Sequence, residues 1–175
     1  MLATNAIVLG IGNLLNSDEG LGIHAVRRLE QELGKPGIGL QFVDGGTLGL
    51  NLLPLIEDAS HLLLLDSVNA GQAPGTIVEL TKDQIPLYSG VKMSLHQTTF
   101  QEVLGLADLR DHLPSHLHLI GVQPADLSIG VELSPIVAGL LPEIVKRAKE
   151  VLIEWGVLAN SESGCVPRSD SGELA

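Results

Sequence analysis

HLLLLD, residues 61–66, is the most hydrophobic segment of the chain and carries no polar side chain between its two ends. Such a continuous apolar run predicts a strand at the centre of a sheet, covered on both faces. The run stops at a carboxylate, Asp66. In sheets of parallel strands, functional sites lie beyond the carboxyl ends of the strands, so Asp66 marks the edge at which a site is expected.

Strand and helix patterns alternate on both sides of this segment. Further short apolar runs predict strands at 5–10, 40–44, 75–80 and 116–122. Amphipathic spacing predicts helices at 21–33, 48–56, 98–110 and 135–155, with a loop over 81–97. This alternation predicts the α/β class: a three-layer fold with a twisted, mostly parallel sheet of about five strands and helices on both faces.

Length and composition limit what the chain can be. Its 175 residues fit one domain, predicted at 1–158, followed by a Ser- and Gly-containing segment, 159–175, predicted to be a flexible tail. Ten Lys and Arg against 21 Asp and Glu give a net charge of −11, which disfavours nucleic-acid binding. No apolar run reaches the roughly 18 residues of a membrane span. The single cysteine, Cys165, excludes an internal disulfide and lies in the predicted tail. We expect a cytoplasmic monomer.

The loop after the first predicted strand, GIGNLLNSDEG at 10–20, contains a Gly-x-Gly pattern before a helix. That arrangement is typical of dinucleotide sites, in which Asp44 would be the ribose-binding acid. However, Leu15 stands where the third glycine of the fingerprint belongs. Asp18 and Glu19 would also repel a pyrophosphate at the helix start. A nucleotide site that uses Gly10-x-Gly12 therefore stays as an alternative.

Four carboxylates fall in or beside loops at the same predicted edge: Asp18, Glu19, Asp44 and Asp66. Each has an ordinary explanation when taken alone. Acids favour the first turn of a helix, and aspartates are common in turns and helix caps. Together, however, they would repel one another unless a cation or a proton relieved the repulsion. The sequence therefore predicts one shared functional site.

His96 is the histidine most suited to that site, because it lies in a predicted loop directly before a helix. A neutral imidazole there could complete a metal site formed with carboxylates. The nucleophile elbow Gly-x-Ser-x-Gly and the zinc helix motif His-Glu-x-x-His are both absent from the sequence.

An ordered set of motifs resembles the [NiFe]-hydrogenase maturation endopeptidases over about residues 5–155. These motifs are Leu9–Leu15, Asp18–Gly20 with Gly22, Asp44–Thr47 with Gly49, Asp66, His96–Gln97 and Gly121–Pro124. The resemblance implies a twisted, largely parallel sheet with flanking helices. It also implies an endopeptidase that removes a C-terminal extension from the nickel-loaded precursor of a hydrogenase large subunit.

The resemblance further implies that Glu19, Asp66 and His96 bind a divalent metal, and that Asp44 is also needed. Glu19, Asp66 and Asp44 are thus the candidate catalytic residues. Two carboxylates and one imidazole leave coordination positions open, so nickel carried by the substrate could dock there. No organic cofactor, nucleic acid or membrane is expected. A non-catalytic chaperone that binds the same precursor is a third hypothesis.

Overall fold

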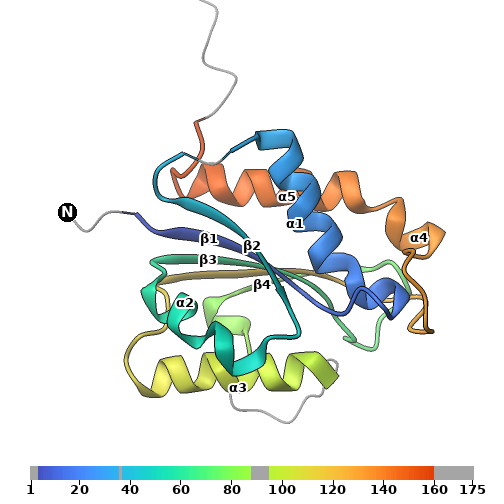
Figure 1. Cartoon of the computed structure of the whole chain (residues 1–175), viewed down its shortest axis with the longest axis horizontal. Helices are drawn as coiled ribbons and strands as arrows, with labels where there is room; N and C mark the ends of the chain where they lie inside the picture. The colour runs from blue at the N-terminus through green and yellow to red at the C-terminus, as the bar shows by residue number, and fades with distance from the viewer. Residues whose placement is uncertain (1–3, 36, 88–94, 160–175) are drawn as a thin grey trace, which may run out of the picture.

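A five-stranded sheet lies between two layers of helices (Figure 1). The computed structural model describes residues 4–35, 37–87 and 95–159, and the side chains of all of these except 95–99. Helices α1 and α5 cover one face of the sheet, and α2 and α3 cover the other. The predicted three-layer α/β class is therefore confirmed.

The strand order is β2-β1-β3-β5-β4. The strands are β1 (Ala6–Ile11), β2 (Leu40–Gly46), β3 (His61–Ser67), β4 (Ile77–Thr81) and β5 (His116–Val122). All but β4 are mutually parallel, and β4 pairs antiparallel with β5. The four parallel strands end along one side of the sheet, here called the carboxyl edge, and begin along the opposite amino edge. The strand at 61–67 is central, as its composition predicts.

The core consists of two aliphatic clusters separated by the sheet. Successive side chains of β3 alternate between them: Leu63 and Leu65 pack with α1 and α5, whereas Leu62 and Leu64 pack with α2 and α3. Full burial of one such leucine contributes about 1.5–3 kcal/mol relative to exposure. A strand buried on both faces can be leucine throughout, which explains the run that the sequence shows.

Helix α1 (Leu21–Leu33) begins at the residue that the sequence predicts and packs very close to the sheet. A Cβ added to Gly22 would overlap the carbonyl oxygens of Ile11 and Leu65, and one added to Gly10 would overlap the carbonyl oxygen of Gly22. Glycine at 10 and 22 thus lets the helix backbone touch β1 and β3. This packing explains the first glycine of the Gly-x-Gly pattern without a nucleotide.

The 48–56 prediction corresponds to a 3-10 turn, η2 (Gly49–Leu52), followed by α2 (Leu53–Asp58). Another 3-10 turn, η3 (Lys82–Gln84), lies within the predicted loop at 81–97.

Helix α3 (Leu95–Leu109) begins three residues earlier than predicted, so the 81–97 loop prediction is wrong at its end. His96 is helical rather than in a loop. Thr98 and Thr99 are poor helix formers, but α3 packs against α2 and η2, and this tertiary packing outweighs their low propensity.

The predicted helix at 135–155 is two helices, α4 (Pro135–Ala138) and α5 (Leu141–Glu154). Ser134 caps α4, its hydroxyl accepting a hydrogen bond from the amide of Val137 at 3.4 Å. The helix breaks because Pro142 has no amide hydrogen to continue the ladder and is suited to the first turn of a new helix.

Across the three described ranges, no helix is long and apolar enough to cross a membrane. The predicted tail, 159–175, lies outside the described residues from position 160 onward, and Cys165 lies there with it.

Candidate active site

Glu19 lies at the carboxyl edge in η1 (Ser17–Gly20), a single 3-10 turn between β1 and α1. Gly12 has φ 140°, and a Cβ at that position would overlap the carbonyl oxygen of Glu19. The same carbonyl accepts a hydrogen bond from the amide of Asn13 at 3.1 Å. Asn16 donates its side-chain amide to Glu19 Oε2 at 2.9 Å. The second glycine of the Gly-x-Gly pattern therefore positions a carboxylate.

The turn that carries Glu19 is strained. Ser17 has φ 46°, in the left-handed region that costs a non-glycine residue on the order of 1–3 kcal/mol. The loop after β5 holds it there: the amide of Ser17 donates to the carbonyl of Gly130 at 2.8 Å, and its hydroxyl donates to the carbonyl of Ser128 at 3.0 Å. Backbone strain of this kind gathers at functional sites.

Asp18 is completely buried and acts as a clamp between distant parts of the chain. Its Oδ2 accepts hydrogen bonds from the amides of Ala125 and Asp126 and from the hydroxyl of Ser134, each at 2.8 Å. Its Oδ1 accepts one from the amide of Ser134 at 2.7 Å. Four donors thus satisfy this charge within the protein. Asp18 supports the loop of Glu19 rather than adding an available ligand to it.

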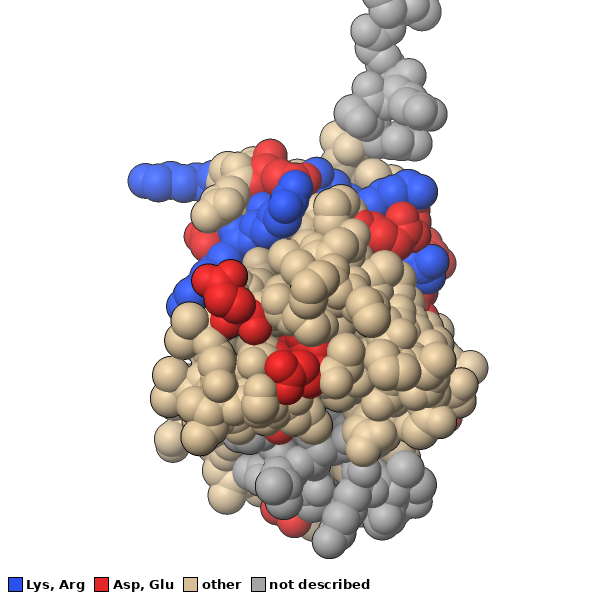
Figure 2. Space-filling view, turned by 90° about the vertical axis from the view of Figure 1, so that its right-hand side faces the viewer, with Lys and Arg blue, Asp and Glu red and all other residues tan. Residues whose placement is uncertain are grey.

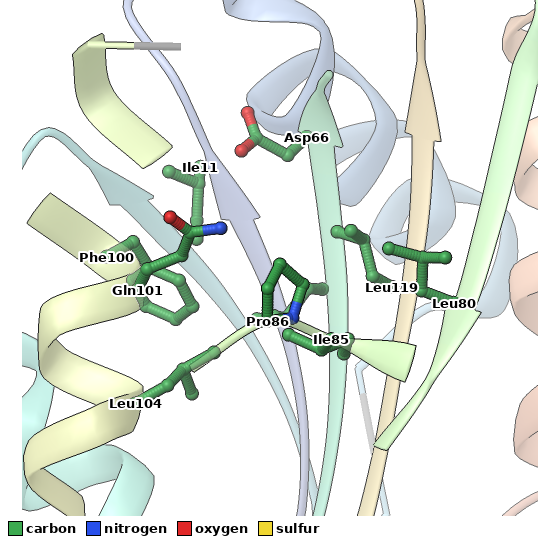
Figure 3. A pocket seen from close by; sticks show the side chains of 10 residues that line it. Ile11, Asp66, Leu80, Ile85, Pro86, Phe100, Gln101, Leu104 and Leu119 are labelled. Carbon is green, nitrogen blue, oxygen red and sulfur yellow. The ribbon is translucent and has the colours of Figure 1, made fainter. Parts of the chain in front are cut away.

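Asp66 is the sixth of the seven residues of β3 and is 4% exposed. Its Oδ1 accepts the amide hydrogen of Ser67 at 2.7 Å. The carboxylate lies at one end of a cavity of about 30 Å³ between the sheet and α3. Figure 3 shows apolar side chains around most of this cavity, with Gln101 as the other polar lining residue. Because η1 packs against β3, Glu19 and Asp66 come from adjoining elements of the same edge.

Asp44 lies at the same edge but on the opposite face of the sheet. It shares side-chain direction with Phe42, which packs on the α1 face, whereas Asp66 shares direction with Leu62 and Leu64 on the α3 face. Arg27 of α1 binds Asp44 Oδ2 at 2.8 Å, and both side chains are substantially exposed. The structure therefore does not bring Asp44 and Asp66 together. Arg27 is a neighbour that sequence analysis missed, since its helix position indicates only a solvent-facing cation.

His96 lies in the first turn of α3, and that end of the helix lies on the carboxyl-edge side of the sheet (Figure 1). Its side chain lies outside the described residues. Within the described part of the chain, no group of three or more His, Cys, Asp or Glu side chains is arranged to hold a metal ion. The ligand set Glu19, Asp66 and His96 stays a prediction.

Gln123 is a structural residue of the carboxyl edge that motif analysis did not explain. Its buried side-chain oxygen accepts the amides of Ala70 at 2.9 Å and Gln72 at 3.1 Å, and its amide donates to Asn69 at 3.3 Å. It therefore fixes the loop between β3 and β4. A polar residue directly after a buried strand is the signal that could have indicated this role.

Comparison with known proteins decides the family. The model of a family described as hydrogenase maturation protease matches residues 23–151. The chain belongs to the hydrogenase maturation protease family. The range matched by this family model includes Asp44, Asp66 and His96, and it begins four residues after Glu19.

Two relatives are similar in sequence to this hydrogenase maturation protease. It is 43% identical over 153 residues to hydrogenase expression/formation protein HupD of Rhodobacter capsulatus, covering 86% of this chain and 72% of HupD. It is 34% identical over 154 residues to the hydrogenase 2 maturation protease of Escherichia coli K12, covering 87% and 93% of the two chains.

The solved structure of the hydrogenase maturating endopeptidase HybD from E. coli superimposes on this maturation protease with a TM-score of 0.81. The two are 31% identical, and the match covers 87% of this chain and 94% of HybD. The chain is thus a peptidase of hydrogenase maturation, and its substrate is a hydrogenase precursor.

Proposed function

We propose that this protease removes the C-terminal extension of a nickel-loaded [NiFe]-hydrogenase large-subunit precursor, and that Glu19, Asp66 and His96 bind the nickel that the substrate carries. The observation that supports this most is the packing of η1 against β3, which places Glu19 and Asp66 on adjoining elements of the carboxyl edge. Carboxylate and imidazole ligands suit a divalent first-row metal, and three of them leave positions for substrate ligands.

Peptide hydrolysis at this edge needs a water molecule to add to the scissile carbonyl and a proton to reach the leaving amine. We assign the contacts with the reacting centre to Glu19 and Asp66, the two carboxylates on adjoining elements. Asp44 acts from the other face of the sheet, held by Arg27, and shapes the site through its own loop. The link is short: Gly12, whose conformation positions Glu19, donates its amide to the carbonyl of Gly46 at 3.1 Å.

The test compares the processing of precursor with and without nickel. Processing is measured as the loss of mass from the large subunit. Wild type should cleave only loaded precursor. Glu19→Gln, Asp66→Asn and His96→Gln should each reduce the rate at least about a hundredfold, the scale for loss of a group that acts in the transition state. Glu57→Gln is the control, since Glu57 pairs with Arg110 away from this edge. Full activity in all three site variants, or equal cleavage of nickel-free precursor, would contradict the proposal.

Three oxygen and nitrogen ligands without a thiolate hold a metal weakly, so the purified enzyme should be largely metal-free. Elemental analysis checks this, and one tightly held zinc or nickel per chain would oppose it. We also propose that the enzyme is a monomer that acts in the cytoplasm. Sedimentation of the purified protein and fractionation of the cells that produce it test these two points.

A further inference from the structure

Exposed apolar side chains gather at the carboxyl edge. Nine large hydrophobic residues are exposed among those that the structure describes. Only Ile38 and Leu109 lie toward the amino edge, between α1 and β2 and at the end of α3. The other seven follow the carboxyl ends of β1, β2 and β5: Leu15, Leu48, Leu50, Leu127, Ile129, Val131 and Ile136. Scattered exposed leucines are normal, but a concentration at one edge indicates a binding surface.

Four of these residues, Leu15, Leu127, Ile129 and Val131, form what we call the apolar ridge. They lie on two loops that a short parallel bridge between Asn16 and Gly130 holds side by side. The amide of Gly130 donates to the carbonyl of Leu15 at 2.9 Å, one residue from this bridge. Ile129 is 94% exposed, and Leu15 and Val131 are each more than 60% exposed.

The ridge is fixed in place, because both of its loops are tied to the same buried clamp. Asp18 binds the amides of Ala125 and Asp126, just before Leu127, and Ser17 binds the carbonyls of Ser128 and Gly130. Surface that is already ordered loses little conformational freedom when a partner binds. Exposed apolar groups on such a scaffold are suited to docking.

The charge distribution favours the same interpretation. The chain carries a net charge of −11, yet Figure 2, which faces the carboxyl edge, shows mostly uncharged surface. Lys and Arg side chains gather toward α1 and α5 in that view, together with several acidic side chains, and a few further acidic side chains lie nearer the middle. An uncharged surface around a few central acids fits a protein partner that brings its own cation to the acids.

We propose that the apolar ridge docks an uncharged, apolar surface on the folded body of the hydrogenase precursor, apart from the peptide that is cut. This inference rests on the proposed function. A precursor whose metal reaches Glu19 must cover the neighbouring surface, since Glu19 is four residues from Leu15 in the same loop. The ridge then contributes to binding the precursor, and the carboxylates contribute to the reaction.

The experiment uses the full-length enzyme and nickel-loaded precursor. Ile129→Glu and Ile129→Lys are the test variants, and Ile38→Glu is the matched control, since Ile38 is also highly exposed but lies toward the amino edge. Both test variants should raise KM at least about tenfold, the scale for a central interface residue, with kcat within about twofold of wild type. Ile129→Leu should retain wild-type KM. Because glutamate and lysine carry opposite charges, a shared effect reports loss of apolar contact.

Each alternative result has a defined meaning. If wild type cleaves the precursor and the test variants keep the KM of the Ile38→Glu control, the docking proposal is wrong. If KM rises with glutamate and falls with lysine, charge rather than apolar contact governs docking, and the proposal is again wrong. If wild type cleaves no loaded precursor, the proposed function fails first. A concentration-dependent dimer that Ile129→Glu abolishes would assign the ridge to a second copy of the chain and overturn the proposal.

Discussion

At the amino edge of the sheet, aromatic rings pack against one another, whereas the carboxyl edge holds carboxylates, strained backbone and exposed leucines. His61 and His116 face each other from neighbouring strands with centroids 4.1 Å apart and planes 5° from parallel. Trp155 packs on both rings, at 5.3 and 6.1 Å. The hydroxyls of Ser60 and Ser115 pair with the two Nδ1 atoms at 2.9 and 3.1 Å.

The difference shows how one small sheet divides its tasks. The rings of the amino edge stack on one another and contribute to the stability of the fold. The features of the carboxyl edge instead lower the free energy of unfolding. The backbone of Ser17 is strained, Asp18 is a buried charge, and the apolar ridge leaves hydrophobic side chains exposed to water. Departures from local rules of this kind are expected at functional sites. The four predictions below test this division, from the largest expected effect to the smallest.

Asp18→Ala should have the largest effect on stability. It removes a fully buried carboxylate that accepts four hydrogen bonds, and it leaves three backbone amides and one hydroxyl without that partner. We expect the free energy of unfolding to fall by about 3–5 kcal/mol, measured by chemical denaturation. Asp83→Ala, an exposed aspartate in η3, is the control and should change it little. A loss below about 1 kcal/mol for Asp18→Ala would show that the carboxyl edge does not depend on this clamp.

Trp155→Ala should reduce stability without reducing activity. The ring is partly buried against both histidines, so we expect a loss of about 2–3 kcal/mol, below the range for a fully buried tryptophan. Processing of loaded precursor, assayed well below the melting temperature, should stay within about twofold of wild type. A large fall in kcat at a temperature where the variant is folded would contradict the division between the two edges.

Stability should also depend on pH through the amino edge. Burial, and then the charge of His116, lower the pKa of His61 from its ordinary value of 6.5. The unfolded chain therefore binds protons more readily than the folded protein. The contribution of His61 is complete above about pH 6.5 and is lost as the pH falls through its lower folded pKa.

His116→Gln removes the charge that repels the protonated form of His61. The decline in the free energy of unfolding toward acid pH should become shallower in this variant, as denaturation at several pH values would show. Burial and the nearby Arg27 also lower the pKa of His24, so a residual slope should persist. An unchanged slope would mean that the two rings do not interact electrostatically.

Arg27→Met should have the smallest effect on stability. Both side chains of its ion pair with Asp44 are exposed, and such pairs contribute about 0–1 kcal/mol to the free energy of unfolding. The melting temperature of Arg27→Met should therefore stay close to that of wild type. The difference between the two melting temperatures should also stay small when the salt concentration is raised. A loss as large as that of Trp155→Ala would show that Asp44 has a structural role that its exposure does not indicate.

Sequence periodicity was enough to predict all five strands and the edge at which the carboxylates gather. Apolar residues recur about every two positions in a half-buried strand and about every 3.6 positions in an amphipathic helix. Both patterns can be recognised within a short stretch of sequence. Glu19 and Asp66 were predicted at this edge because each follows or ends a recognisable strand. The early start of α3 and the division of the last helix were missed, because packing against α2 and the position of Pro142 decided them.

The different fates of neighbouring Asp18 and Glu19 could not be predicted in this way. The partners of Asp18 lie 107–116 residues away in the sequence, and nothing local distinguishes the two acids. Similarly, the strand pattern placed Asp44 at the correct edge, but the packing of Phe42 and the ion pair with Arg27 show which face it occupies. The Gly-x-Gly pattern was ambiguous for the same reason, since the contacts of Gly10 and Gly12 come from other elements.

The clamp formed by Asp18 also sets an order in time. While the chain is being synthesised, η1 emerges early, but the amides that satisfy Asp18 belong to residues 125–134 and emerge more than a hundred residues later. Until then, burial of this carboxylate would leave a charge without partners. The strained turn that carries Glu19 therefore takes its final form only after most of the chain has been made. A ribosome-bound fragment that ends before Ala125 contains all five strands but none of the residues that donate to Asp18, so its carboxyl edge is unfinished.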